Sequence, residues 1–446
     1  MNTPHPDSLA ARSSRSVWHP CTQMRRHESL PPIAVERGHG PWLYDTDDRR
    51  YLDAISSWWV NLFGHTNARI NRALTDQLGR LEHAMLAGFT HEPVVALSEK
   101  LAALTGHALG RCFYASDGAS AVEIALKMSV HAWRNIGHSD KTEFICIAGG
   151  YHGETLGALG VTDTALFRAP YEAMLRPAHI AASPDARLAL PGERASDVAT
   201  RALADVERLL QERHGRIAAV IVEPLVQCAN GMAMHDPAYV AGLRKLCDAY
   251  GAHLIADEIA VGCGRSGSFF ACEQAGVWPD LLCLSKGISG GYLPLSLVMA
   301  REHIYQAFYD DDVRRGFLHS HSYTGNALAC RAALETLAIF EDDDVLERNR
   351  RFAHTMTAAL HPLAQDARIA HFRRTGMIWA CDVRLDHARA SDFARRFAQE
   401  AARREVLMRP IGNTLYLMPP YILDDAHAAW LGRRVYEAFE AAMGMQ

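Results

Sequence analysis

The feature that most constrains this chain is the segment from about residue 105 to residue 300, where short apolar runs alternate with helix-periodic stretches. Because neighbouring parallel strands need a long crossover, this alternation predicts an α/β fold with a mostly parallel sheet covered by helices on both faces. The expected strands are residues 111–114, 143–147, 217–222, 252–256, 281–284 and 296–300.

Polar residues follow several of these runs. In open α/β sheets, ligands bind beyond the carboxyl ends of the strands, so these residues are expected to share one rim of the sheet. The rim residues are Ser116, Asp117, Gly118, Tyr151, His152, Gly153, Glu223, Pro224, Asp257, Glu258 and Lys286.

Lys286 is the first candidate for a reacting group, because the apolar run 281–284 delivers it into a glycine-rich turn. A lysine amine becomes a nucleophile when burial or a neighbouring cation lowers its pKa. The alternative is a lysine that extends from the strand end to solvent.

Three other rim segments also have two interpretations each. Gly118 and the helical segment after it could hold a phosphate on free backbone N–H groups, or could be an ordinary capped helix start. Asp257 could fix a positive charge on a ligand, or pair with a structural arginine. Tyr151 could stack on a flat ligand, or pack within a capped turn.

Two further patterns are weaker. The segment 262–267 matches G-x-G-x-x-G, but Asp257 and Glu258 lie just before it, where their charge would repel a pyrophosphate. His319 and His321 could ligate a metal, but a third ligand at suitable spacing is not evident, so we predict no metal site.

The two chain ends have a different pattern from the centre. Residues 40–59 read as two short β-rich runs around a turn, followed by Trp58 and Trp59, and residues 68–104 read as two helical blocks broken near His91. After residue 335 the pattern becomes helix, strand and helix, with strands at 377–383 and 414–418. We expect an N-terminal segment (1–65) that joins a C-terminal α+β domain (336–446) beside a large domain (66–335).

Composition narrows the function classes. A charged fraction of 22% and a net charge of -5 give no basic excess for a nucleic-acid partner. The sequence lacks a run of about twenty apolar residues for a membrane span, and its ten cysteines form no C-x-x-C pair. We therefore expect a cytoplasmic protein. Arg12 and Arg15 among serines faintly resemble a transit peptide, and a frayed terminus is the alternative.

Taken together, the phosphate-type turn, Tyr151-His152-Gly153, the strand ending in Asp257-Glu258 and Lys286 resemble, in order and spacing, the class III aminotransferases. These are fold-type I pyridoxal phosphate enzymes, so the resemblance implies that cofactor and a homodimer. It extends from Trp18 to Tyr421.

The resemblance also implies a role for particular residues. Lys286 would carry the cofactor and move a proton, Asp257 would bind the protonated pyridine nitrogen, and Tyr151 would stack on the ring. Gly118 and Ala119 would hold the phosphate, Ile259 would contact the cofactor, and Ser322 would complete the phosphate site of the neighbouring subunit. Substrate would contact Trp58, Trp59, Tyr151, Ser320 and Arg409, whose guanidinium would bind a carboxylate.

Within that class, the segments 18–20, 56–59, 257–260 and 416–421 are most similar to members that act in biotin biosynthesis. This similarity implies S-adenosylmethionine as amino donor and 8-amino-7-oxononanoate as acceptor, in a ping-pong cycle. Cys21 stands where known members carry a tyrosine, and Ser320-His321 replaces the usual glycine-containing pair, so the donor stays open. Alternatives are an ω-amino acid or diamine aminotransferase that uses a donor such as lysine, a nicotinamide oxidoreductase, and a non-catalytic cofactor-binding protein.

Overall fold

The computed structural model describes residues 7–386 and 392–444. Its central element is a seven-stranded sheet in the order β4-β12-β11-β10-β7-β5-β6. Only β12 runs antiparallel to its neighbours. The strands are β4 (Arg111–Ala115), β5 (Glu143–Ile147), β6 (His179–Ala181), β7 (Ile217–Val222), β10 (His253–Asp257), β11 (Leu281–Leu284) and β12 (Ser296–Ala300).

The six strands expected from the alternating pattern are all present, with ends that shift by one residue at β4 and β10. The expected list missed β6, a three-residue edge strand whose Ile180 is exposed. A strand this short and half-exposed carries too few apolar residues to stand out from a loop.

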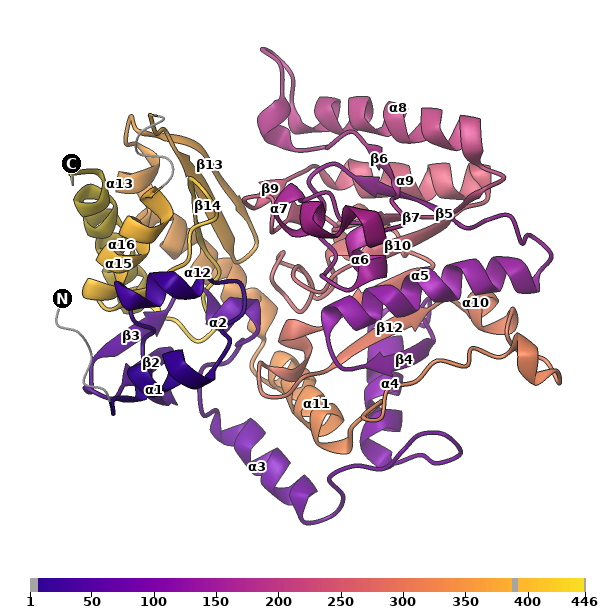
Figure 1. Ribbon diagram of the computed structural model, residues 1–446, viewed down its shortest axis with the longest axis horizontal. Helices are drawn as coiled ribbons and strands as arrows, with labels where there is room; N and C mark the ends of the chain where they lie inside the picture. The colour runs from indigo at the N-terminus through magenta and orange to yellow at the C-terminus, as the bar shows by residue number, and fades with distance from the viewer. Residues whose placement is uncertain (1–6, 387–391, 445–446) are drawn as a thin grey trace.

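Helices cover both faces of this sheet. In β7 all six residues are buried, with Ala219 and Ile221 packed towards α5 (Gly118–Asn135). Val220 and Val222 point the other way, towards α8 (Ala195–Arg213) and α9 (Pro237–Tyr250). Figure 1 shows α8 and α9 on one side of the sheet and α5 on the other. Burial on both faces is the reason this strand is a continuous apolar run.

The remaining helices surround this sheet and the smaller sheets. They are α1 (Leu9–Ser16), α2 (Ser56–Trp59), α3 (Ala68–Leu78), α4 (Glu92–Leu104), α6 (Leu156–Gly160), α7 (Ala165–Arg168), α10 (Glu302–Gln306), α11 (Ala327–Asp342), α12 (Val345–Ala359), α13 (His361–Ala364), α15 (Phe393–Arg403) and α16 (Asp425–Gly444). The break expected near His91 is where α4 begins, with the His91 side chain as its N-cap. No helix among the described residues has the length and apolar character needed to cross a membrane.

The two chain ends share a sheet. Strands β1 (Val35–His39), β2 (Trp42–Asp45) and β3 (Arg50–Asp53) form an antiparallel meander, and β3 pairs in parallel with β15 (Val406–Leu407). A second sheet has the order β13-β14-β16, from β13 (Ile369–Thr375), β14 (Ile378–Val383) and β16 (Thr414–Leu417). The expected list contained β14 and β16 but missed β13, which carries two arginines and is only partly buried. The domain boundaries stay a prediction, and α11 runs through residue 335.

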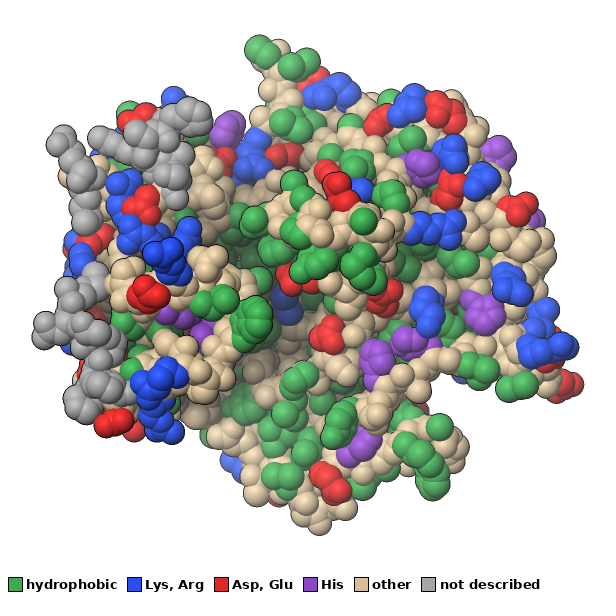
Figure 2. All heavy atoms as spheres, in the orientation of Figure 1, with side chains coloured by type: hydrophobic (Ala, Val, Ile, Leu, Met, Phe, Trp, Pro, Cys, Tyr) green, Lys and Arg blue, Asp and Glu red, His purple; other side chains and the backbone are tan. Residues whose placement is uncertain are grey.

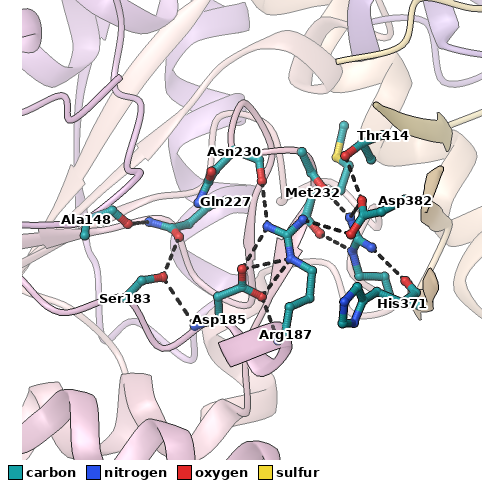
Figure 3. A network of polar contacts seen from close by, with 12 residues as sticks. Ala148, Ser183, Asp185, Arg187, Gln227, Asn230, Met232, His371, Asp382 and Thr414 are labelled. Atoms are coloured by element: carbon teal, nitrogen blue, oxygen red, sulfur yellow. Dashed lines mark hydrogen bonds and ion pairs between the residues drawn. The ribbon is translucent and has the colours of Figure 1, made fainter. Parts of the chain in front are cut away.

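A buried polar network joins the C-terminal sheet to the large one (Figure 3). Asp382 of β14 pairs with Arg373 at 3.0 Å and with Arg187 at 3.3 Å, and it accepts a hydrogen bond from Thr414 Oγ1 at 2.8 Å. Arg187 also pairs with Asp185 at 2.8 Å. A small two-stranded ribbon, β8 (Val226–Gln227) with β9 (Ala233–Met234), leads into the loop that this network holds.

Candidate active site

A cavity of about 310 Å³ lies at the carboxyl ends of the sheet strands. It brings together eight residues that were predicted to bind cofactor or substrate, namely Trp58, Trp59, Gly118, Ala119, Tyr151, Asp257, Ile259 and Lys286. It also contains Cys21 and the predicted rim residues His152, Gly153 and Glu223, together with Glu154, Ala229 and Ala260, which the sequence did not single out. Figure 2 shows a hollow at the centre of this face of the molecule, with hydrophobic side chains gathered around it.

Lys286 follows β11 after one intervening residue, Ser285, and has a left-handed backbone, with φ 48°. Non-glycine residues adopt that conformation at a cost, and such strain is concentrated at functional sites. Its ammonium lies 4.6 Å from the centre of the Trp59 ring. Burial lowers the pKa of the amine, whereas Cys228, Asp257 and Glu223 act in the opposite direction. Because its pKa is lowered, this amine is neutral, and therefore nucleophilic, more often than the amine of an exposed lysine.

Asp257 ends β10 and is only 4% exposed. Its Oδ2 accepts a hydrogen bond from His152 Nδ1 at 2.8 Å, and its Oδ1 accepts one from the backbone N–H of Ile259 at 3.1 Å. The other ring nitrogen of His152, Nε2, is buried and has no hydrogen-bond partner within the described residues. The Asp257 partner is therefore a histidine, and not the structural arginine that the alternative interpretation required.

Glu223 follows β7 and lies beside this pair. Its carboxylate accepts hydrogen bonds from the backbone N–H groups of Tyr151 at 2.9 Å and Cys228 at 3.2 Å. Burial raises the pKa of Glu223 to about 7. The sequence places both His152 and Glu223 after strand ends, but we predicted no role for either residue. Their position on the same rim of the sheet as Asp257 was the feature that could have indicated a role.

The start of α5 forms one wall of the cavity. The Asp117 side chain caps the helix by accepting a hydrogen bond from the backbone N–H of Ser120 at 3.0 Å. The N–H groups of Gly118 and Ala119 belong to the first helical turn, where a helix supplies no carbonyl partner. The Asp117 cap uses only one of the free N–H groups at the start of α5, so the same helix start can both be capped and bind an anion.

Two glycines keep this wall open. A Cβ on Gly118 would lie 3.0 Å from Ile259 Cγ2, and a Cβ on Gly153 would lie 2.5 Å from Ala119 Cβ. Gly153 also has φ 121°, which side-chain-bearing residues rarely adopt. The loop that carries Tyr151 can therefore approach the start of α5 only with glycine at position 153, whereas Gly118 leaves room for the side chain of Ile259.

Tyr151 lines the cavity and its hydroxyl donates a hydrogen bond to Glu154 Oε1 at 2.9 Å. Burial raises the pKa of this phenol well above its usual value, so the ring stays neutral. Phe167 packs against it at a ring distance of 5.3 Å.

Trp58 and Trp59 point to different groups. Trp59 is 6% exposed, and its indole N–H donates to the Tyr416 hydroxyl at 3.3 Å. Trp58 is 41% exposed, and the Arg409 guanidinium lies 4.5 Å from its ring centre. Arg409 does not line the cavity itself, but it donates a hydrogen bond to the carbonyl of Cys21 at 2.9 Å, and Cys21 does line it.

Ser320 and Ser322 lie apart from this cavity, and both are exposed. The backbone carbonyl of Ser322 accepts a hydrogen bond from His83 Nε2 at 2.8 Å. His319 and His321 contact each other at 3.2 Å between their Nε2 atoms. Within residues 7–386 and 392–444, no group of three or more His, Cys, Asp or Glu side chains is arranged to hold a metal.

The fold and the cavity define a class of enzyme in which a lysine that lines the cavity and a buried aspartate act on a phosphate-bearing cofactor. A family model described as "Aminotransferase class-III" matches residues 23–439. The chain belongs to this family, whose members are fold-type I enzymes that depend on pyridoxal phosphate.

Named relatives agree with this assignment. An adenosylmethionine-8-amino-7-oxononanoate aminotransferase of Helicobacter pylori is 43% identical over 94% of this chain and 94% of its own length. The crystal structure of the protein of that name from Methanocaldococcus jannaschii is 32% identical, with a TM-score of 0.90 over 97% of this chain and 98% of that one. An amine transaminase from an uncultivated Pseudomonas species, solved with pyridoxal phosphate bound, is 30% identical, with a TM-score of 0.89 over 95% and 98%.

The residues present fit this cofactor. The buried Asp257 suits a protonated ring nitrogen, the start of α5 suits a phosphate, and the amine of Lys286 faces the same cavity.

Proposed function

We propose that this protein is the aminotransferase of biotin biosynthesis that moves an amino group from S-adenosylmethionine to 8-amino-7-oxononanoate, giving 7,8-diaminononanoate with pyridoxal phosphate as cofactor. The observation that carries the proposal is the placement of Lys286, Asp257 and the indole of Trp59 around one cavity. The names of relatives that cover nearly the whole chain support the choice of substrates.

Pyridoxal phosphate, when bound, supplies an electron sink for charge that develops at the carbon bearing the amino group. The residues of this chain hold it and move the protons. The N–H groups of Gly118 and Ala119 would bind the phosphate, Tyr151 would stack on the ring, Ile259 would contact it, and Asp257 would accept a hydrogen bond from the ring nitrogen. Lys286, whose pKa is lowered by burial, would move a proton between the substrate carbon that bears the amino group and the cofactor.

The substrate side of the cavity has its own chemistry. Arg409 would bind a substrate carboxylate with two parallel hydrogen bonds, which a planar guanidinium permits. The indoles of Trp58 and Trp59 would line the path of the aliphatic chain of the acceptor, and Ser320 would contact substrate. Cys21 supplies a small side chain at this wall, so the aromatic contact here would come from Trp58.

We also propose that the protein is a homodimer. Ser322 is exposed and lies outside the cavity of its own chain, as expected for a residue that completes the phosphate site of a second copy. The exposed Leu318 and Tyr323 on the same segment would be covered in such a dimer. We also propose a cytoplasmic location, which the ten free cysteines support.

The test follows the visible absorbance of the bound cofactor in the purified holoenzyme. S-adenosylmethionine is expected to bleach it, and 8-amino-7-oxononanoate is expected to restore it. The matched variant Lys286→Ala should bind cofactor but show neither borohydride-sensitive absorbance nor bleaching. If S-adenosylmethionine is inert while lysine or 4-aminobutyrate bleaches the wild type, the protein is instead an ω-amino acid or diamine aminotransferase, as the structural likeness to an amine transaminase would allow.

A further inference from the structure

A hairpin tip, residues 228–232 between β8 and β9, contributes Ala229 to the lining of the cavity. In the same tip, the backbone N–H of Cys228 donates to Glu223 Oε1 at 3.2 Å. The other carboxylate oxygen of Glu223 accepts the backbone N–H of Tyr151 at 2.9 Å. The tip is therefore joined, through one buried carboxylate, to the loop that carries the ring expected to stack on the cofactor.

The tip also packs directly on the Tyr151 loop. A Cβ on Gly149 would lie 2.2 Å from Asn230 Nδ2, so the Asn230 side chain occupies the space beside this glycine. Gly149 has φ 75°, a conformation that glycine adopts readily. A shift of the tip would therefore be passed to the backbone just before Tyr151.

The backbone of the tip is strained. Gly231 and Met232 are both left-handed, with φ 60° and 54°, and the Met232 side chain is fully buried. A Cβ on Gly231 would lie 2.7 Å from Thr414 Oγ1, so the tip also lies against the C-terminal sheet. A residue with a side chain keeps a left-handed conformation only where surrounding contacts impose it. Contacts from outside the tip are therefore needed to hold it.

Two arginines supply these contacts to three consecutive carbonyls. Arg373 of β13 donates from Nε to the carbonyl of Met232 at 2.9 Å, and from Nη2 to the carbonyl of Gly231. Arg187 Nη2 donates to the carbonyl of Asn230 at 3.1 Å (Figure 3). Because β13 belongs to the C-terminal sheet, part of the cavity wall is held from outside the large sheet.

Arg373 is itself fixed in place. Its side chain is only 10% exposed, and its Nη2 lies 3.0 Å from Asp382 Oδ1. Its Nη1 donates to the carbonyl of His371 at 2.7 Å. Arg373 is not among the residues that line the cavity, so its contacts reach the site only through the tip.

We propose that Arg373 is a positioning residue for the cofactor, because it holds the hairpin tip that supports Ala229, Glu223 and the Tyr151 loop. This inference rests on the proposed function for the identity of the cofactor. Arg373 would act through the backbone of the tip without touching cofactor or substrate. Lysine cannot replace it, because one ammonium lacks the planar fork that reaches both carbonyls and Asp382.

The main test measures in the holoenzyme how often the tip opens. Cys228 lies in the tip and is 1% exposed, so iodoacetamide reaches its thiol only when the tip opens locally. Cys247 of α9 is fully buried and reports opening of the large domain as a whole. Arg373→Lys is expected to raise the alkylation rate of Cys228 at least tenfold, with the rate of Cys247 changed less than threefold. Mass spectrometry of the two peptides measures both rates.

Arg368→Lys is the matched control, because Arg368 lies just before β13 and pairs with Asp366 at 2.7 Å rather than with the tip. Its Cys228 rate and its affinity for pyridoxal phosphate should stay within twofold of the wild type. Arg373→Lys should bind pyridoxal phosphate at least fivefold more weakly. An unchanged Cys228 rate, an equal rise at both cysteines, or an unchanged cofactor affinity in Arg373→Lys would overturn the proposal.

A second variant and a donor-independent readout complete the test. If Arg373→Lys does not fold, Arg187→Lys takes its place, because it weakens the tie to Asn230 and should raise the Cys228 rate at least threefold; a rate within twofold of the wild type would reject the proposal. Neither alkylation nor cofactor affinity depends on the amino donor. If S-adenosylmethionine fails with the wild type, the proposed function falls while the Cys228 rate still decides the role of Arg373.

Discussion

His152 donates a hydrogen bond through Nδ1 to the Oδ2 atom of Asp257 at 2.8 Å, and both side chains are almost fully buried. The contact orients the carboxylate that faces the cofactor cavity. We expect His152→Leu to lower kcat by roughly 10–100-fold, because a hydrogen bond to a charged group contributes about 1.5–3 kcal/mol. His152→Asn, which keeps a donor, should retain more activity. Steady-state kinetics of both variants check this, and equal losses would argue against an orienting hydrogen bond.

Arg409 rests on the exposed face of Trp58, 4.5 Å from its ring centre. Arg409→Lys should raise the KM for a carboxylate substrate by about tenfold, because lysine loses the paired hydrogen bonds and the flat stacking surface. Cofactor affinity should not change, since Arg409 lies outside the residues that line the cavity. Initial rates over a range of substrate concentrations measure the effect. A fall in kcat at constant KM would show that the arginine acts elsewhere.

We expect the stability of the protein to depend on pH through His253, which is not one of the residues that line the cavity. Burial lowers its pKa to about 4, while Asp280 opposes the shift and His303, Arg244 and Lys141 add to it. Its pKa in the folded state is below the unfolded value, so the unfolded state binds the extra proton and stability falls as pH drops from about 6.5 to 4. The full loss from this residue would be about 3 kcal/mol.

The matched variant for this effect is His253→Phe. A phenyl ring can keep the stacking on Trp133, where the ring centres are 4.4 Å apart. Ser129 Oγ, which lies 2.9 Å from His253 Nδ1, can still donate to the carbonyl of Ala218. Thermal midpoints of both proteins from pH 4 to 8 should show a shallower acid slope for the variant. Identical slopes would mean that other groups set the acid limit.

Asp382 joins the C-terminal sheet to the large sheet through Arg187 and Arg373. Asp382→Asn should lower stability by roughly 1.5–3 kcal/mol, because it leaves the partly buried Arg373 without its carboxylate partner, whereas Arg187 keeps its pair with Asp185. Glu437→Gln, which breaks a partly exposed pair with Arg434, is the control and should cost less than about 1 kcal/mol. Thermal unfolding of the two variants gives the comparison. Similar midpoints would show that the Asp382 network adds little to stability.

The sequence determined the parts of the protein that depend on neighbours along the chain. Strands buried on both faces must be continuous apolar runs, so β7, β10 and β11 could be read directly. The order of Gly118, Tyr151, Asp257 and Lys286 indicated the family, since each lies at or just beyond the end of its strand. The exposed edge strands β6 and β13 were missed, because their composition does not differ from that of loops.

Only the tertiary structure decided which of these residues meet. The pairing of His152 with Asp257 joins two strand ends more than a hundred positions apart in the sequence. The left-handed turn at residues 56–59 opposes local preference, since it contains no glycine, and it depends on Asp53 and Arg265. Local propensity cannot predict a conformation that distant contacts impose, because those contacts exist only in the folded chain.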